Sequence, residues 1–249
     1  MREISSLTHP LVKHLVSLRQ SAVYRDVNNS VLVHGQKMVH ELLSERPFRL
    51  LVVADERLIP SHVPAAEIIV ANQAILEKIT GVPTPEGIAA EVERPVWEDL
   101  SFSKRVLALD GISDPGNLGT LLRTALALGW DGVYLLDGCC DPYNDKALRA
   151  SMGATFRLSI ARGSWDELES KSFTRGWAAY VAELSGMEPS EVPERDNILL
   201  VLGNEARGPS SRAHGLCASV TIPMSGEMES LNVAVAGGIL MYLLGPTSL

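Results

Sequence analysis

The chain has 249 residues, enough for one large domain or two ordinary ones, and its 46% hydrophobic and 21% charged residues are typical of a globular protein. A formal net charge of −8 excludes a protein that holds nucleic acid by overall electrostatic attraction alone. Residues 1–50 carry seven Lys and Arg against four Asp and Glu, however, so a basic surface near the N-terminus stays possible.

Cysteine usage and hydropathy narrow the class of protein further. Cys139, Cys140 and Cys217 are too few for a disulfide framework, and no metal-ligand spacing accompanies them. The chain opens on polar residues rather than on a signal peptide, and its longest apolar run, 233–244, is too short to span a bilayer. We therefore predict a reduced, cytoplasmic protein without a metal or a membrane partner.

Helical and strand patterns alternate over the first ninety or so residues. Apolar spacing predicts a helix around 11–18, a strand at 30–34 and a second helix around 38–43. Further strands are predicted at 50–54 and 67–70, and Asn72 is placed to cap a helix over 73–78. These units indicate a small α/β or α+β module.

Periodicity fades and charge clusters over residues 91–103. We interpret this stretch as a linker, which divides the chain into one domain over 1–95 and another over 104–249.

The second domain has a clear α/β rhythm. A buried strand at 106–110 leads through a turn-rich loop, 111–119, to a helix over 120–128 and a strand at 132–136. The alternation continues through these segments: 144–152, 156–160, 165–170, 177–182, a strand at 197–202, a strand at 219–222 and a helix over 232–244. This pattern predicts an open parallel sheet with helices on both faces, which binds ligands beyond the carboxyl ends of its strands.

Three groups of polar residues interrupt the apolar segments of this domain. They are Asn117-Leu-Gly119 with Arg123, Gly203-Asn-Glu205, and Ser230-Leu-Asn232. Singly, each has a structural explanation: Asn117 in a loop or cap, Arg123 as a solvated charge on a helix, Gly203-Asn-Glu205 as a turn, and Ser230 as a helix N-cap. Their joint presence favours a functional site.

Other familiar sites fit less well. The Gly-rich stretch 111–119 has neither the Lys-Ser/Thr ending of a phosphate-binding loop nor the spacing of a dinucleotide-binding turn. No Ser-His-Asp order is present, and the six histidines, including His214 in a Gly/Ser-rich loop, are interpreted as structural or solvated.

Together the three groups resemble the motifs of the SpoU (TrmH-like) family of RNA ribose 2'-O-methyltransferases, in the SPOUT superfamily. Asn117-x-Gly119-x-x-x-Arg123 is similar to the first motif, residues 203–208 to the second, and 222–224 with 230–234 to the third, in the family's order. Residues 84–88 and 149–154 match more weakly. Two departures are Ala206, where Gly is usual, and His34, where Glu is common.

The resemblance implies a fold, a cofactor and partners. The fold is α/β: a SPOUT-type, trefoil-knotted, parallel-sheet methyltransferase domain after an N-terminal L30e-like α/β substrate-binding domain. The cofactor is S-adenosyl-L-methionine, the partners are RNA and a second copy of the chain in a homodimer, and ribosomal RNA is preferred to transfer RNA as substrate.

The resemblance also implies residue roles. The catalytic group comprises Arg123, Asn117, Glu205, Ser230 and Asn232, and the cofactor-binding group comprises Gly203, Ile222, Met224 and Leu231. A guanidinium stays protonated at neutral pH, so Arg123 is expected to grip a phosphate and stabilise the developing alkoxide rather than to act as a free base.

Two alternatives from other classes stay open. The first is an RNA-binding or assembly factor that keeps the same fold but lacks catalysis. The second is a nucleotide-dependent dehydrogenase, which the sequence supports less well. Titration with S-adenosyl-L-methionine and with NAD(H) separates these alternatives from the methyltransferase.

Overall fold

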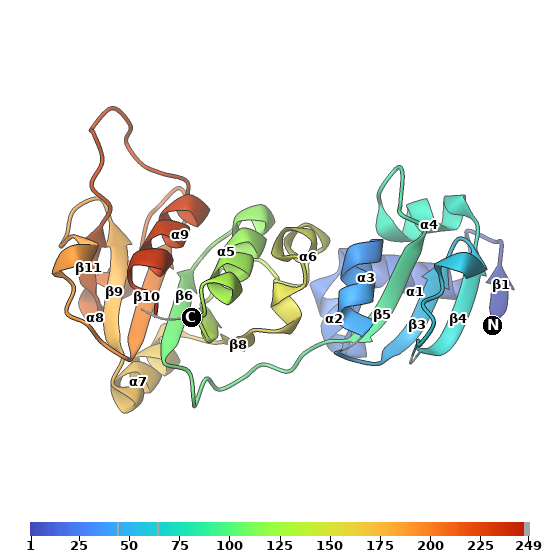
Figure 1. Cartoon of the computed structure of the whole chain (residues 1–249), viewed down its shortest axis with the longest axis horizontal. Coiled ribbons are helices and arrows are strands. Elements are labelled where there is room, and N and C mark those ends of the chain that lie inside the picture. The colour runs from blue at the N-terminus through green and yellow to red at the C-terminus, as the bar shows by residue number, and fades with distance from the viewer. Residues whose placement is uncertain (44, 64, 247–249) are drawn as a thin grey trace. The chain divides into compact units, whose positions relative to one another are not determined.

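The computed structural model describes residues 1–43, 45–63 and 65–246, and the chain forms two compact units (Figure 1). The first unit comprises Met1–Pro95 with Tyr143–Leu148, and the second holds the rest of the described chain. Each unit has its own sheet and its own hydrophobic core. In the described ranges, every helix is too short or too polar to cross a membrane.

The first unit is built on a five-stranded sheet of order β1-β4-β3-β5-β2. Its strands are β1 (Arg2–Ile4), β2 (Ser30–His34), β3 (Phe48–Val53), β4 (Ala65–Ala71) and β5 (Ile88–Glu93). Its helices are α1 (Pro10–Gln20), α2 (Ala22–Asn28), α3 (Gln36–Leu43) and α4 (Gln73–Thr80), with a 3-10 turn at Glu56–Leu58. Strand β5 runs antiparallel to both of its neighbours, so the sheet is mixed.

Sequence patterns identify most of these elements, and Asn72 caps α4 as expected, because its Oδ1 accepts the N–H of Ile75 at 3.0 Å. They miss β1, α2 and β5. The predicted linker, 91–103, is wrong at its start, since Glu91 lies inside β5 and is only 8% exposed. Its Oε2 lies 3.2 Å from Nε2 of His14, a partner that sequence periodicity does not reveal.

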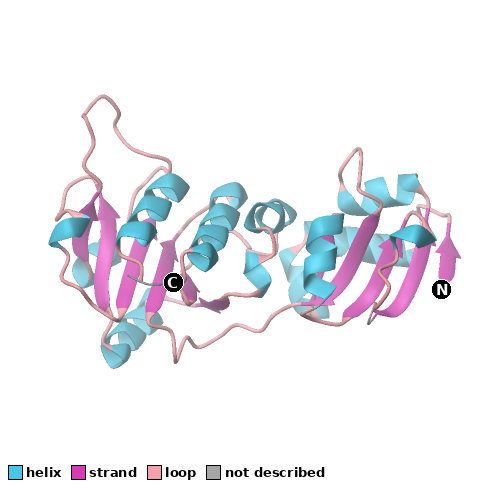
Figure 2. Ribbon diagram, viewed as in Figure 1, coloured by secondary structure: helices cyan, strands magenta, loops and turns pink. Residues whose placement is uncertain are grey.

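The second unit is built on six parallel strands in the order β11-β9-β10-β6-β7-β8, which confirms the predicted parallel sheet (Figure 2). The strands are β6 (Arg105–Asp110), β7 (Gly132–Leu135), β8 (Ser159–Arg162), β9 (Ala178–Glu183), β10 (Ile198–Gly203) and β11 (Ala218–Thr221). Its helices are α5 (Pro115–Ala127), α7 (Trp165–Arg175), α8 (Ser211–Leu216) and α9 (Val233–Leu243), with 3-10 turns at Ala154–Phe156 and Pro189–Glu191. Helix α6 (Asp145–Ser151) is divided between the units, since its residues up to Leu148 belong to the first.

Helices cover both faces of this sheet because successive strand residues point to opposite sides. On one face, Val106 and Val201 share a core cluster with Leu168 of α7 and Ala213 of α8. On the other face, α5 and α9 pack together over β10. Gly237 favours this close packing, since a Cβ there would lie 2.5 Å from Cδ1 of Leu202 and 2.6 Å from Cδ2 of Leu121, and both leucine side chains would have to shift.

Three local predictions in the second unit are wrong. Helix α5 starts at Pro115 rather than at 120, because Asp114 caps it by accepting the N–H of Asn117 at 2.9 Å, so Asn117 belongs to the first helical turn. The N-cap of α9 is Asn232 rather than Ser230, since its Oδ1 accepts the N–H groups of residues 234 and 235. His214 lies in α8 rather than in a loop.

Candidate functional site

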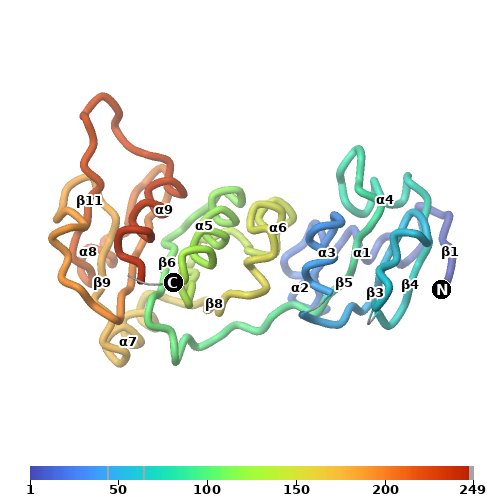
Figure 3. Tube along the Cα trace, viewed as in Figure 1, coloured from blue at the N-terminus to red at the C-terminus, as the bar shows by residue number. Residues whose placement is uncertain are grey.

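A pocket of about 800 Å³ opens at the carboxyl ends of β9, β10 and β11 in the second unit. One wall includes residues of the long segment between β11 and α9, which Figure 3 shows as an extended excursion of the chain. Eight predicted site residues line the pocket: Asn117, Gly203, Glu205, Ile222, Met224, Ser230, Leu231 and Asn232. The volume is within the usual range for small-molecule sites.

Glu205 joins the second motif to the loop before α5. Its Oε2 accepts the backbone N–H and the hydroxyl of Ser113, both at 3.2 Å. Its Oε1 accepts the N–H of Asp114 at 3.2 Å and the side-chain amide of Asn117 at 3.1 Å. Partial burial raises the pKa of Glu205, but these hydrogen bonds outweigh it and hold the pKa below its ordinary value of 4.5. The carboxylate is therefore a fixed anion at neutral pH.

Asn117 extends this connection to the third motif. Its Oδ1 accepts a hydrogen bond from Nδ2 of Asn232 at 3.1 Å. Because the amide oxygen of Asn232 also caps α9, one chain of hydrogen bonds runs from Glu205 through Asn117 to the start of α9. The three motifs thus form a single constellation, with Asn117 at its centre.

Asn204 belongs to the second motif but had no catalytic or cofactor-binding role assigned from sequence, and it shapes the loop that carries Glu205. Its Nδ2 donates to the carbonyl of Gly111 at 2.7 Å, and its Oδ1 accepts the N–H groups of Ala206 and Arg207 at 3.0 and 3.1 Å. Gly208 takes the left-handed conformation, with φ of 69°, whereas Ala206 keeps a negative φ. Ala206, which stands where the family's motif usually has Gly, therefore places no backbone strain on this turn.

Gly203 is required because the returning loop crosses directly over it. A Cβ at this position would overlap backbone atoms of Gly208 and Pro209, so the main chain of the loop would have to shift. Gly203→Ala is expected to lower the free energy of unfolding by about 1–3 kcal/mol, measured by urea denaturation. The control is Gly215→Ala, where a Cβ meets nothing within 4 Å, and an equal loss in both variants would contradict this explanation.

Arg123 is the predicted site residue that does not line the pocket. It lies on α5, farther along the helix than Asn117, and its side chain is exposed. Within the described part of the chain, its guanidinium has no hydrogen-bond or ion-pair partner. The group is therefore available to an anion approaching from outside the pocket.

Glu183 and His214 also line the pocket, although sequence reasoning did not place either there. Nε2 of His214 lies 3.2 Å from Oε1 of Glu183, and the side chains are 49% and 23% exposed, respectively. A signal for Glu183 was present, since it directly follows segment 177–182 of the predicted α/β alternation, and the structure shows it as the last residue of β9. Among the described residues, no group of three or more His, Cys, Asp or Glu is arranged to hold a metal.

Family models match both halves of the chain. The model described as the SpoU rRNA Methylase family matches residues 104–242. A second model, the MRM3-like substrate binding domain, matches residues 9–90. The first match spans the pocket and the hydrogen-bonded constellation described above.

Individual proteins resemble the chain over most of its length. It is 33% identical to the 23S rRNA (guanosine(2553)-2'-O)-methyltransferase RlmP of Bacillus subtilis, over 98% of this chain and 99% of the relative. It is 36% identical to the 23S rRNA (adenosine(1067)-2'-O)-methyltransferase of Streptomyces laurentii, over 79% of this chain and 73% of the relative. A structure of an AdoMet-bound rRNA methyltransferase from Sinorhizobium meliloti superposes with a TM-score of 0.87 and 27% identity, covering 97% and 96% of the two chains.

Proposed function

Because this chain belongs to the SpoU rRNA methylase family, we propose that it transfers a methyl group from S-adenosyl-L-methionine to a ribose 2'-hydroxyl of 23S ribosomal RNA. The observation that carries the proposal is the convergence of three distant motifs on one pocket through Glu205, Asn117 and Asn232. The names of the two relatives from Bacillus subtilis and Streptomyces laurentii support 23S ribosomal RNA as the substrate.

The pocket suits an adenosyl ligand. Ile222, Met224 and Leu231 offer apolar surface for a purine ring, and Gly203 brings the backbone of β10 to the lining without a side chain. We assign these four residues to cofactor binding. When bound, S-adenosyl-L-methionine supplies a methyl group activated by a positively charged sulfonium.

The protein's own residues act mainly by positioning and by charge. Glu205, Asn117 and Asn232 hold the loop before α5 and the start of α9 in one geometry. We assign to Ser230, which lines the same pocket, the role of orienting the ribose. Placing two reacting groups contributes on the order of 7–11 kcal/mol. Arg123, outside the pocket, grips a phosphate of the RNA bidentately and stabilises the negative charge that develops on the attacking oxygen.

Mapping of ribose methylation in ribosomal RNA, with and without the gene, tests this function. We expect one 2'-O-methyl mark to disappear on deletion, and the purified protein to restore it to the unmodified RNA. An all-deoxy copy of the same sequence is the control, because it lacks the acceptor hydroxyl. Methylation of the deoxy copy, or an unchanged pattern of marks, would contradict the proposal.

A homodimer is part of the proposal and is supported by the surface of α9. Val235, Ile239, Tyr242 and Leu243 are apolar residues of this helix with exposed fractions of 52%, 36%, 74% and 53%. A run of exposed apolar residues on one helix is typical of an interface. We therefore place the second copy of the chain against this helix.

Tyr242→Glu is expected to weaken self-association about tenfold or more, because it places a charge in the apolar interface. Sedimentation velocity over a range of concentrations measures the change. Val27→Glu is the matched control, since Val27 is 79% exposed on α2 of the first unit. A wild-type protein that sediments as a monomer at all concentrations would contradict the dimer.

Two further features complete the proposal. We infer a trefoil knot in the second unit, as the family resemblance implies. We also infer a cytoplasmic location, which is supported by the three free cysteine thiols.

A further inference from the structure

Two carboxylates line the pocket, and they differ in the hydrogen bonds they already accept. Both oxygens of Glu205 accept hydrogen bonds, from five donors in Ser113, Asp114, Asn117 and Asn204. Glu183 has one partner, His214, which contacts Oε1 at 3.2 Å. Within the described residues its Oε2 accepts no hydrogen bond. Glu183 is thus the pocket carboxylate with capacity left for a ligand.

The fold places Glu183 where a ligand is expected. It is the last residue of β9, which lies between β10 and β11, and it pairs in register with Thr221, the last residue of β11. Ala182, Leu184 and Ile222 line the pocket around it. The side chain is 23% exposed, so it is accessible from the pocket while the surrounding protein limits competition from water.

We propose that Glu183 is a specificity-determining residue that accepts hydrogen bonds from the ribose hydroxyls of the adenosyl cofactor, with His214 as its positioning residue. This inference rests on the proposed function. The 2'- and 3'-hydroxyls of a ribose are adjacent donors, and a carboxylate at the end of a parallel strand binds such hydroxyls in dinucleotide-binding folds. Hydrogen bonds to a charged acceptor are about twice as strong as neutral ones, which makes the contact selective.

Calorimetry on the full chain tests the role with four ligands. Glu183→Gln is expected to raise the Kd of S-adenosylhomocysteine and of 5'-methylthioadenosine by the same factor, about tenfold, because both carry the ribose. The wild type is expected to bind adenosine about tenfold more tightly than 3'-deoxyadenosine, and the variant to bind the two almost equally.

Different results would overturn the assignment. A loss confined to S-adenosylhomocysteine would place Glu183 at the ammonium group of the amino-acid part, which 5'-methylthioadenosine lacks. An unchanged preference for adenosine over 3'-deoxyadenosine in the variant would remove the ribose contact. If Glu183→Gln does not fold, the test is the binding of adenosine and 3'-deoxyadenosine to the wild type. Equal Kd values for these two nucleosides overturn the proposal.

Control variants separate this role from structural effects. Glu169→Gln removes a carboxylate that pairs with Arg212 of α8 at 3.0 Å outside the pocket lining, and is expected to leave every Kd unchanged. His214→Gln keeps a donor for Glu183 and is expected to bind more tightly than His214→Ala. A wild-type protein that binds no adenosyl ligand contradicts the proposed function, whereas wild-type binding with an unaffected Glu183→Gln contradicts only this inference.

Discussion

Replacing Arg123 by alanine is expected to lower the rate of methyl transfer about 10²–10³-fold, while the Kd for S-adenosyl-L-methionine stays unchanged. The two effects separate because Arg123 is exposed on α5 and does not line the pocket. We therefore expect Arg123 to contact the RNA rather than the cofactor. Single-turnover transfer of a labelled methyl group and calorimetry on the same preparation measure the two quantities.

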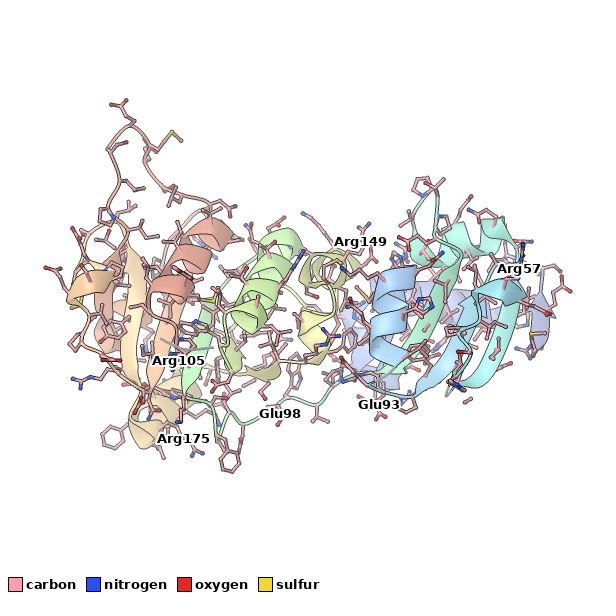
Figure 4. All side chains as sticks on the ribbon, viewed as in Figure 1. Arg57, Glu93, Glu98, Arg105, Arg149 and Arg175 are labelled. Carbon is pink, nitrogen blue, oxygen red and sulfur yellow. The ribbon has the colours of Figure 1, made fainter. Side chains whose placement is uncertain are left out.

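Two further variants sharpen this test. Arg123→Lys keeps the positive charge but loses the planar fork that grips a phosphate through two hydrogen bonds, so it is expected to stay impaired. Arg175→Ala is the control. Arg175, labelled in Figure 4, is the last residue of α7. Its backbone carbonyl accepts a hydrogen bond from the side-chain amide of Asn197, which directly precedes β10. Arg175 therefore lies at the end of the sheet opposite the pocket. Equal loss of catalysis and cofactor binding in Arg123→Ala would contradict its proposed role.

Glu205→Gln is expected to lower turnover about 100-fold, because small displacements of positioned groups have effects of that size. The glutamine replaces one carboxylate oxygen by an NH₂ group, which faces hydrogen-bond donors that the oxygen accepts in the wild type. Two donors cannot pair with each other, so the loop before α5 and Asn117 must move. Since Glu205 is exposed, water replaces part of the lost interaction, and the expected loss of stability is only about 1 kcal/mol. Turnover and urea denaturation of the same variant measure both quantities.

The pH dependence of stability provides an independent check on Glu205. Its pKa is lowered in the folded protein, so the stabilisation by the carboxylate is present above its ordinary pKa of 4.5 and is lost as the pH falls through the lower folded value. The difference in unfolding free energy between wild type and Glu205→Gln is therefore expected to be constant near neutral pH and to narrow in acid. A difference that widens in acid would contradict the hydrogen-bonded carboxylate.

The parallel sheet was predictable from sequence because its strands are continuous apolar runs, and β6 and β10 lie where those runs predict them. The apolar spacing did not predict the start of α5, because Gly116 and Gly119 weaken the helical pattern. The better signal was Asp114-Pro115, a capping residue followed by a proline at the first helical position. Strand β5 was missed because Glu91 resembles a surface residue until its contact with His14 is known.

The candidate site was also predictable from sequence only in part. Motif residues such as Asn117 and Asn232 were identifiable by their spacing and order, although the hydrogen bond between them depends on the packing of α5 against α9. No spacing rule predicts that Arg123 lies outside the pocket or that His214 of α8 meets Glu183 of β9. These relations depend on the tertiary fold, which brings distant segments to one edge of the sheet.

The hydrogen bond between Asn117 and Asn232 joins residues separated by 115 positions, and this separation bears on how the site is made during folding. Contacts between distant residues form late, since a long loop must close before they contribute. A growing polypeptide that has not yet released α9 from the ribosome therefore lacks one wall of the pocket. Cofactor binding is consequently expected to report that α9 has packed against the second unit, and its onset during translation to mark the arrival of this helix.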